Sequence, residues 1–300
     1  MARIPNLTFV VFTYNEEARL PFVIRNFRSY GHILVVDNYS TDRTRDIANE
    51  QGCDVLLNRN EGGFMENQQT CDNVQAAVHT DWMFWLAADE LVAADALEEL
   101  ERLIRLDRYD VICMMRKNYF QGAFCHDIAT GYRARAFKKN TIDFRNNKIH
   151  EFGRIVVPKE RVYYMPSRYF VHHLISNTAA TYLETIQRYT EIEQRVRAPE
   201  ELDRSLLYLL LLPVKALWGD YILKGGIKGG RQAMHLSAMM MTYLLLKVIK
   251  GYEAKMGLTA EEIAQRNRQI AETILQTIPA SKTASQTDGR QETVSPQNMP

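Results

Sequence analysis

Two adjacent carboxylates stand where a buried strand is expected to end. In the stretch TDWMFWLAADELVAADALEEL, residues 80–100, the apolar run from Trp82 to Ala88 stops at Asp89 and Glu90. Carboxylates at such a position can bind a cation or accept hydrogen bonds from a ligand. Glu90 can also be a first-turn acid favoured by the dipole of the next helix. The choice depends on the elements that position the two acids.

The first half of the chain alternates between strand-like and helix-like patterns. Apolar runs of strand length lie at residues 7–13, 32–37, 53–58 and 81–87, and helical patterns at 16–31, 40–52, 65–80 and 93–107. This alternation with short joints predicts βαβ units and a parallel sheet, and continuously apolar strands predict that both faces are covered. The second helix is expected to have Ser40 or Thr41 as its N-cap.

The residues that follow the four strands are polar or acidic. They read TYNEE, DNYSTD, NRNEGG and AADE. Ligands of open α/β sheets bind at the carboxyl ends of the strands, so four such ends favour a binding site there over simple loop polarity. Neither GxGxxG nor GxxxxGK[ST] is present, which disfavours a nicotinamide or ATP site of the usual kind.

Composition narrows the class of protein further. The 300 residues allow one large domain or two smaller ones, and the formal net charge of +1 predicts no bulk attraction to nucleic acid. The four cysteines, at positions 53, 71, 113 and 125, lack CxxC spacing. This pattern argues against a zinc site or a disulfide scaffold and suits a reducing cytoplasm. No signal peptide is visible before the first strand.

Four motifs in this order resemble the nucleotide-sugar-binding half of the family-2 glycosyltransferases, which have the GT-A fold. They are FVVFTYNEEARLPFVIRNF, ILVVDNYSTDRTRDIA, NEGGFMENQQTCDN and DWMFWLAADE. Within the family, the chain is similar to the branch that contains the lipopolysaccharide inner-core glucosyltransferases. The likeness covers roughly residues 5 to 155 and continues more weakly to about 255. It implies an α/β fold, a GT-A-type mostly parallel sheet flanked by helices and followed by a helical C-terminal region.

The resemblance implies that the two acids hold a divalent ion, Mg²⁺ or Mn²⁺. In the family this strand normally ends in DxD followed by Glu, and the ion lies against the diphosphate of the donor. A cation offsets both the repulsion between neighbouring carboxylates and the negative charge that grows on the leaving diphosphate. Asp89 and Glu90 are therefore the expected metal ligands. Ala87 stands in place of the first Asp, so donor binding is expected to be weaker, the metal to be held differently, or the chain to be inactive.

The resemblance also implies that side chains from the first three strand ends bind the nucleotide sugar. They are Thr13, Tyr14, Glu16, Asp37, Asn38, Ser40 and Arg59. Asp37 matches the acid that accepts a hydrogen bond from the base. Arg59 is either near the diphosphate or a solvated surface arginine. Asp72 stands where the family usually has a basic residue, which is a second departure from the pattern.

Two later pieces, RAFKK and KIHE, look like the arginine strand and the His-Glu motif of this branch. The resemblance implies an inverting transfer with Glu151 as the general base, His150 completing the metal shell or orienting Glu151, and Arg135 in the donor site. A surface loop is the alternative for the His-Glu pair. The basic residues of this region suit a diphosphate donor and a phosphorylated or lipid-linked acceptor, or a solvated strand face. They are Arg133, Arg135, Lys138, Lys139, Arg145 and Lys148.

The last part of the chain has a different pattern. An amphipathic helix is expected at residues 179–197, followed by two apolar runs that fall short of the ~20 residues needed to span a bilayer. Between Lys215 and Lys250 the segment carries six basic residues and one acid, Asp220. We expect interfacial helices on an anionic membrane surface, with a helical core or a homo-oligomer interface as the alternative. The polar segment from 279 is expected to be disordered.

Taken as a whole, the sequence predicts a nucleotide-sugar-binding and catalytic domain at 1–160, a helical region at 161–278 and a tail at 279–300. The expected activity is metal-assisted inverting hexosyl transfer from a UDP-sugar to a lipid-linked, lipopolysaccharide or other glycan acceptor. The expected location is cytoplasmic, peripheral on the inner face of the cytoplasmic membrane. A catalytically impaired pseudoenzyme or scaffold is the alternative, because of Ala87 and Asp72. A nucleotidyltransferase would need a Gly-rich, lysine-containing opening loop, which is not found.

Overall fold

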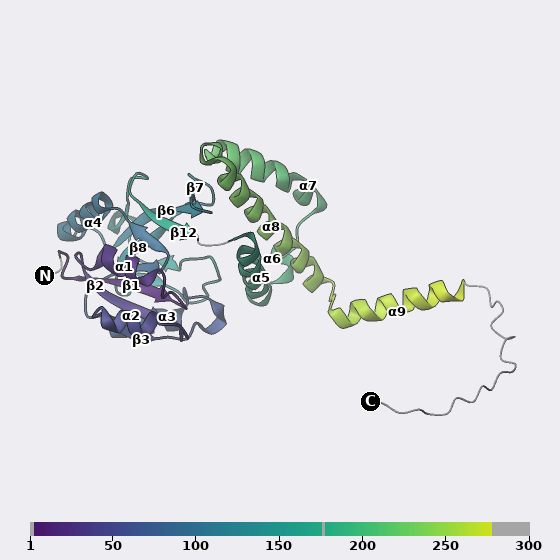
Figure 1. Cartoon of the computed structure of the whole chain (residues 1–300), viewed down its shortest axis with the longest axis horizontal. Helices are drawn as coiled ribbons and strands as arrows, with labels where there is room; N and C mark the ends of the chain where they lie inside the picture. Colours follow the sequence, from purple (N-terminus) through teal and green to yellow (C-terminus); the bar gives the residue numbers. More distant parts are fainter. Residues whose placement is uncertain (1–2, 176–177, 278–300) are drawn as a thin grey trace, which may run out of the picture. The chain divides into compact units, whose positions relative to one another are not determined.

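The structure, a computed structural model, describes residues 3–175 and 178–277 (Figure 1). It divides into two units, Met1–Lys255 and Met256–Pro300. The first unit contains the sheet and most of the helices, and the second contains α9 (Ala260–Gln276). The tail predicted to be disordered, 279–300, lies outside the described residues.

The first half of the chain forms the predicted parallel sheet. Its strands are β1 (Leu7–Thr13), β2 (His32–Asp37), β3 (Asp54–Leu57) and β4 (Trp82–Ala87). They lie in the order β3-β2-β1-β4, and all three pairings are parallel. The connecting helices are α1 (Leu20–Phe27), α2 (Thr44–Glu50) and α3 (Gln68–Ala77). This arrangement brings the four polar strand ends to one edge of the sheet.

Beyond β4 the sheet becomes mixed. Its further strands are β5 (Glu90–Val92), β6 (Val111–Phe120), β8 (Gly131–Lys138) and β12 (Phe170–Ile175), and α4 (Ala94–Leu106) follows β5. β8 is antiparallel to β4 and β6, β12 is parallel to β6, and β5 is antiparallel to β12. The shorter strands are β7 (Ala123–Phe124), β9 (Ile142–Asp143), β10 (Arg154–Ile155) and β11 (Val162–Tyr164). The α/β class with a GT-A-type sheet is confirmed.

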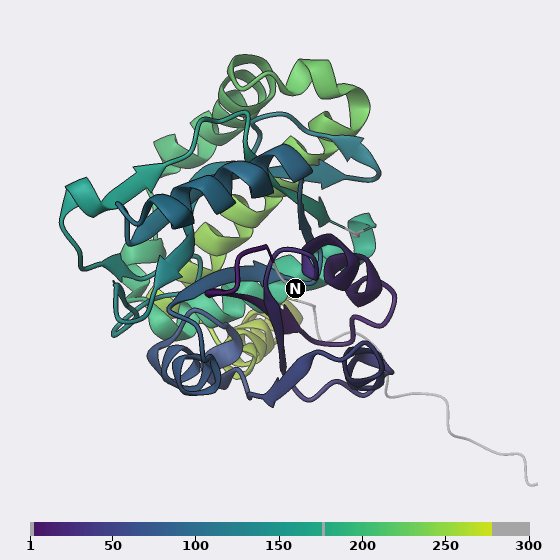
Figure 2. The same ribbon diagram turned by 90° about the vertical axis from the view of Figure 1, so that its left-hand side faces the viewer.

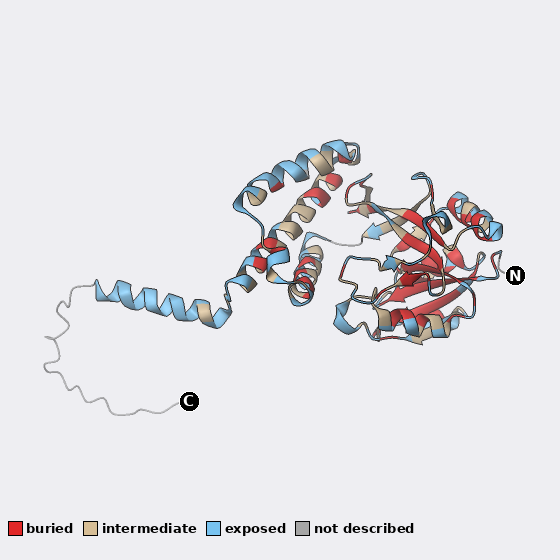
Figure 3. Ribbon diagram, turned by 180° about the vertical axis from the view of Figure 1, so that it is seen from behind, coloured by how far each residue is buried: buried red, intermediate tan, exposed pale blue. Residues whose placement is uncertain are grey.

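Hydrophobic cores cover both faces of the sheet, as the continuously apolar strands predict. Phe9 and Phe84 pack on one face with residues of α1 and α4, while Val10 and Trp85 pack on the other with residues of α3. Successive strand residues thus point to opposite cores. Figure 2 shows helices on both sides of the strands. Figure 3 shows that the buried residues are concentrated in the strands.

The predicted N-cap of α2 is wrong. The helix begins at Thr44, whose backbone N–H donates to Asp42 Oδ1 at 2.9 Å. Ser40 instead donates from its backbone N–H and its hydroxyl to the buried carboxylate of Asp37. A buried carboxylate requires hydrogen-bond donors, so Ser40 donates to Asp37 and does not cap the helix.

The helices from α5 to α8 belong to the same unit as the sheet. They are α5 (Ala179–Val196), α6 (Pro199–Leu202), α7 (Leu206–Val214), the π-helical η3 (Lys215–Leu223), η4 (Gly226–Gly229) and α8 (Gly230–Lys255). By length and composition alone, Pro199–Leu223 and Gly226–Lys255 qualify as membrane spans. The apolar runs were expected to be too short to span a bilayer. The helical stretches that contain them are longer, so this expectation is wrong for the stretches as a whole. In the apolar 18-residue window of each stretch, 6% of the first is buried against 22% of the second, so the exposed apolar surface lies mainly on α7 and η3.

Candidate functional site

Asp37 is the buried centre of the edge formed by β1 and β2. Its side chain is fully buried, and Oδ2 accepts hydrogen bonds from the hydroxyls of Thr13, at 3.0 Å, and Ser40. Oδ1 accepts from the Ser40 backbone N–H at 2.8 Å, and Arg45 Nε lies 3.9 Å from it. The predicted residues Thr13, Asp37 and Ser40 are thus brought together, with Asp37 held in one orientation.

The loops after β1 and β2 interlock above this centre. The Asn15 backbone N–H donates to Ser40 Oγ at 2.9 Å, and Asn15 Oδ1 accepts from the Thr41 N–H at 2.8 Å. Asn15 and Tyr39 have φ values of 55° and 60°, in the left-handed region that few non-glycine residues adopt. Asn38 Oδ1 accepts from the Asn60 N–H at 3.0 Å and joins the third strand end to the other two.

An exposed aromatic and cationic rim borders these loops. Tyr14 is 53% exposed, Tyr39 is 47% exposed, and the guanidinium of Arg59 lies 5.1 Å from the centre of the Tyr39 ring. Such a rim is suited to stacking against a planar base and to contacting an anion. Tyr39 was not singled out from the sequence. Its signal would have been a large aromatic side chain in the turn between Asn38 and Ser40.

Asp89 presents a carboxylate with one oxygen available. Oδ2 lies 3.3 Å from His173 Nε2 and 3.6 Å from Arg19 Nη1. Oδ1 is buried and has no hydrogen-bond partner among the described residues. Burial acts to raise the pKa of Asp89, but His173 and Arg19 outweigh it, so the pKa lies below its ordinary value. Glu16, another predicted residue, binds Arg19 through both carboxylate oxygens and so belongs to the same charged group.

His173, like Tyr39, was not singled out from the sequence. Its Nδ1 lies 2.8 Å from Asn118 Oδ1 on β6. Asn118 Nδ2 donates to the carbonyls of Ile128 and Ala129, which fixes the amide orientation and leaves the oxygen for His173. His173 Nδ1–H therefore donates to Asn118, and Nε2 faces Asp89 Oδ2, to which it donates when it carries a proton and toward which it directs a lone pair when it does not. A lone pair opposite a carboxylate is the arrangement that a cation between them would stabilise.

Glu90 and Arg135, predicted as a metal ligand and a donor contact, form a buried ion pair. Arg135 Nη1 and Nη2 donate to the two carboxylate oxygens of Glu90, both at 2.8 Å. The Ala87 backbone N–H donates to Glu90 Oε2 at 3.0 Å. Burial favours the neutral acid, but Arg135 and Arg116 outweigh it and lower the pKa of Glu90. Both oxygens of Glu90 are thus engaged within the protein.

Glu151 lies in the loop between β9 and β10, and its carboxylate accepts a hydrogen bond from Arg197 at the end of α5. Its Oε2 accepts from the Lys148 backbone N–H at 3.1 Å, and its Oε1 lies 3.3 Å from Arg197 Nη2. The His150 ring packs edge-on against Tyr189 and Tyr243, with centroids 5.0 and 5.8 Å away. Among the described residues, no hydrogen bond joins His150 to Glu151 or to Asp89, so the structure does not bring these three predicted groups together.

A buried acid of the helical region supports Arg197. Glu193 accepts hydrogen bonds from the Tyr243 hydroxyl at 2.8 Å and from Lys247 Nζ at 2.7 Å, and Arg197 Nε lies 3.7 Å from it. Burial, together with Glu193, raises the pKa of Tyr243. Through these contacts, α5 and α8 orient the arginine that reaches the Glu151 loop.

Within residues 3–175 and 178–277, no group of three or more His, Cys, Asp or Glu side chains is arranged to hold a metal ion. Asp89 and His173 together nevertheless fit a divalent ion, because Asp89 Oδ2 and His173 Nε2 face each other 3.3 Å apart, and a carboxylate oxygen and an imidazole nitrogen are both common metal ligands. Mg²⁺ is commonly bound by one or two carboxylates plus phosphate oxygens of a substrate. A two-residue protein contribution therefore requires further oxygens from a ligand.

Comparison with known families identifies the class. The family model described as Glycosyl transferase family 2 matches residues 8–158, half of the chain. The chain therefore belongs to the family-2 glycosyltransferases.

Solved structures of two other proteins are similar to this chain. S. aureus TarS has 14% identity and a TM-score of 0.42, over 82% of this chain and 54% of that chain. TarS residues 1–349 in complex with UDP-GlcNAc have 13% identity and a TM-score of 0.43, over 85% of this chain and 93% of that chain. Glucosyl-3-phosphoglycerate synthase from Mycobacterium tuberculosis was solved in complex with Mn²⁺, UDP and glucosyl-3-phosphoglycerate. It has 12% identity and a TM-score of 0.39, over 64% of this chain and 80% of that chain. At these TM-scores the similarities define no substrate for this chain.

Proposed function

We propose that this glycosyltransferase moves a hexosyl unit from a UDP-sugar to a lipid-linked or glycan acceptor, with inversion and with Mg²⁺ or Mn²⁺ bound. The observation that carries the proposal is the pair formed by Asp89 and His173 beside the strand ends. Asp89 Oδ2 and His173 Nε2 lie 3.3 Å apart, and the second oxygen of Asp89, Oδ1, is buried without a hydrogen-bond partner among the described residues. The similarity to the lipopolysaccharide inner-core branch supports a lipopolysaccharide acceptor within this class.

The proposed metal ligands from the protein are Asp89 and His173. The bound ion would neutralise charge on the diphosphate as it leaves. We assign Glu90 to support, because its two oxygens are engaged by Arg135 and by the Ala87 backbone. Holding Glu90 in this way fixes the turn that carries Asp89. Because Ala87 replaces the first acid of the motif, the metal would be bound only by Asp89, His173 and oxygens of the donor.

The nucleotide is proposed to bind along the ends of β1 and β2. Thr13, Asp37, Asn38 and Ser40 form the buried polar floor, and Tyr14 and Arg59 lie on the exposed rim. We add Tyr39, which contacts Arg59, as a surface for the base or ribose. The hydrogen bonds within the floor support a preorganised site that needs little rearrangement on binding.

Glu151 remains our proposed general base. In the transfer, the acceptor oxygen would bond to the anomeric carbon as the bond from that carbon to the diphosphate breaks. The acceptor proton would then pass to the Glu151 carboxylate. Arg197 Nη2 lies 3.3 Å from Glu151 Oε1 and orients the carboxylate. His150, whose ring lines the neighbouring cavity, is proposed to shape the acceptor side rather than to bind the metal.

We propose a division into a catalytic domain at 1–160 and a helical region at 161–278 that meets the inner face of the cytoplasmic membrane. Support comes from large apolar side chains that are at least 48% exposed on α7 and η3. They are Leu206, Leu207, Leu210, Leu211, Val214, Leu217, Trp218 and Leu223. Lys215, Lys224, Lys228 and Arg231 flank them, as expected for an anionic membrane surface. An interface between two copies of the chain is the alternative for this surface.

A thermal-shift screen of UDP and UDP-sugars, with and without Mn²⁺, tests the proposal. A true donor should raise the unfolding midpoint by mass action, and more so with Mn²⁺. Slow donor hydrolysis in the presence of metal would identify a working transferase. Binding without hydrolysis or transfer would instead support the pseudoenzyme alternative, which Ala87 and Asp72 motivate. The absence of binding by every UDP compound would contradict the proposed donor class.

A further inference from the structure

A separate cavity of about 370 Å³ opens beside the antiparallel part of the sheet. It is lined by residues of β6 and β8 and by the loop before β10, among them Arg116, Arg133, Tyr132 and His150. None of the strand-end residues Thr13, Asp37 and Asp89 lines it. The cavity is large enough for a sugar-sized group as well as an anion.

Most basic side chains that the sequence places in this region already have partners. Lys138 pairs with Asp107 and Asp110, and Lys139 donates to the carbonyl of Val78. The remaining pairs are Arg135 with Glu90, Arg145 with Asp143, and Lys148 with Glu201. Of the six predicted basic residues, only Arg133 lines the cavity.

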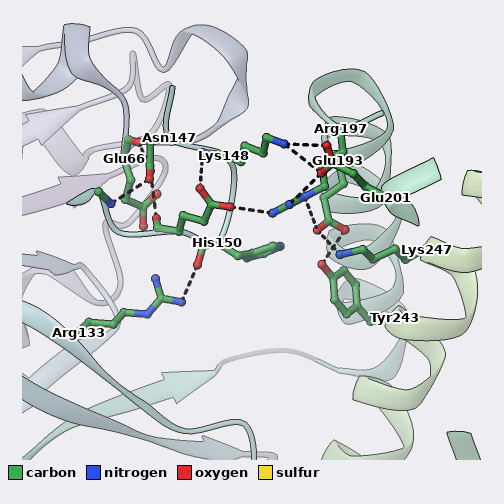
Figure 4. Close-up of polar contacts among 12 residues, drawn as sticks. Glu66, Arg133, Asn147, Lys148, His150, Glu193, Arg197, Glu201, Tyr243 and Lys247 are labelled. Carbon is green, nitrogen blue, oxygen red and sulfur yellow. Dashed lines mark hydrogen bonds and ion pairs between the residues drawn. The ribbon is translucent and has the colours of Figure 1, made fainter. Parts of the chain in front are cut away.

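Arg133 has no carboxylate within salt-bridge distance among the described residues. Its one hydrogen bond is donated by Nη2 to the backbone carbonyl of His150 at 3.3 Å (Figure 4). The second arginine of the cavity, Arg116, has its closest acidic contact at 3.8 Å, with Glu90 Oε1. Glu90 is itself matched by Arg135 at 2.8 Å. Two guanidinium groups therefore share one cavity with little negative charge to offset them.

The other polar groups around the cavity do not supply the missing charge. Tyr132 and Thr130 donate their hydroxyls to backbone carbonyls, of Met165 and Asp127 respectively. Glu66 is the carboxylate whose field acts most directly on Arg133. Burial raises the pKa of Glu66 and so weakens its tendency to carry charge. Burial and the neighbouring Arg116 both lower the pKa of Arg133, and they outweigh the opposite effect of Glu66.

We propose that Arg133 and Arg116 form an oxyanion subsite that binds a phosphate group of the acceptor. The inference rests on the proposed glycosyl transfer and specifies its acceptor class as a phosphorylated sugar or a lipid-borne phosphate. Arginine is suited to this role because its planar fork of donors matches the oxygens of a phosphate. The subsite would hold the acceptor beside the loop that carries His150 and Glu151.

Calorimetric titration of the full chain with glucose 6-phosphate, in the presence of saturating UDP, tests the subsite. Glucose, which lacks the phosphate, is the ligand control. The wild-type protein should bind the phosphorylated sugar and not glucose. Arg133→Gln should weaken binding by roughly tenfold or more, and Arg133→Lys, which keeps the charge, by less. Arg154→Gln is the matched control, because Arg154 is an exposed arginine of β10 that pairs with Asp143 outside the cavity.

A second arm distinguishes a lipid source of the phosphate. Vesicles of phosphatidic acid in phosphatidylcholine are compared with pure phosphatidylcholine, and Arg133→Gln should reduce retention on the former. The proposal is overturned if neither phosphate source binds the wild-type chain, or if Arg133→Gln and Arg154→Gln bind alike. UDP affinity is measured for each variant. Unchanged UDP affinity in a variant shows that its fold and its donor site are intact. If the wild-type chain itself does not bind UDP, the result contradicts the proposed function and not the subsite.

Discussion

Arg135 and Glu90 form a two-pronged ion pair inside the sheet, with both N–O distances at 2.8 Å. The pair joins β8 to the turn after β4, and both side chains are almost fully buried. Asp89 is the residue directly before Glu90, so this pair limits the movement of the proposed metal ligand. Glu90 thus holds the turn in which Asp89, the proposed metal ligand, lies.

Removing the acid of this pair should destabilise the protein strongly. Glu90→Gln leaves Arg135 buried without its counter-charge, and the expected loss in free energy of unfolding is about 3–5 kcal/mol. Glu99→Gln is the matched control, because Glu99 pairs with Arg102 at the surface of α4, and it should change little. Urea denaturation of the three proteins measures the difference. Equal stability of the two variants would show that the buried pair does not hold the turn.

Metal dependence should follow Asp89 and His173. Asp89→Asn and His173→Gln should abolish the effect of Mn²⁺ on UDP binding while the fold stays intact. His172→Gln is the control, because His172 contacts Tyr119 instead of Asp89 and lies one position away on the same strand. UDP titrations with Mn²⁺ or with EDTA provide the measurement. An Asp89→Asn variant with the wild-type response to Mn²⁺ would rule out the proposed metal site.

Restoring the missing acid should not harm the donor site. Ala87 is half-buried and its backbone N–H already supports Glu90, so Ala87→Asp adds a carboxylate without removing a known contact. UDP affinity in the presence of Mn²⁺ should be unchanged or improved. Marked loss of affinity in a folded Ala87→Asp variant would mean that this site excludes a second carboxylate.

Glu151→Gln should separate chemistry from donor binding. The substitution keeps the shape and removes the proton acceptor, so turnover should fall by roughly 10²-fold or more with little change in UDP affinity. Glu201→Gln is the control, since Glu201 also lies close to Arg197 and Lys148. If turnover persists in Glu151→Gln, the residue is structural. Asp127, which pairs with Lys117, is then the next acid to test.

Membrane association should have an electrostatic and an apolar part. The protein should co-sediment with anionic liposomes, less with neutral ones, and be partly released by high salt, because each Lys or Arg near the surface contributes ~1 kcal/mol. Replacing Lys224, Lys228 and Arg231 by Gln should mimic the salt effect. The control replaces three exposed cations of the sheet region: Arg25, Arg108 and Lys159. Wild-type protein that stays in the supernatant at low salt would favour a core or an oligomer interface.

The sequence by itself determined the parallel half of the sheet and the edge that carries the site. Strands β1 to β4 and helices α1 to α4 follow from local periodicity, and parallel pairing then necessarily brings Thr13, Asp37 and Asp89 to one edge. Helix ends were less predictable. Ser40 had the residue type of an N-cap, but the buried carboxylate of Asp37 took its hydrogen bonds.

Only the tertiary structure decided which partners the charged residues have. His173 reaches Asp89 because β12 inserts between β5 and β6, a pairing of strands far apart in the chain that no local pattern encodes. The antiparallel pairing of β8 with β4 and β6 placed Arg135 against Glu90 and left Arg133 facing a cavity. A charged residue has the same local signature whether it is paired, coordinating or available for a ligand. Its role depends on which distant group lies within a few ångströms, and only the folded chain determines that distance.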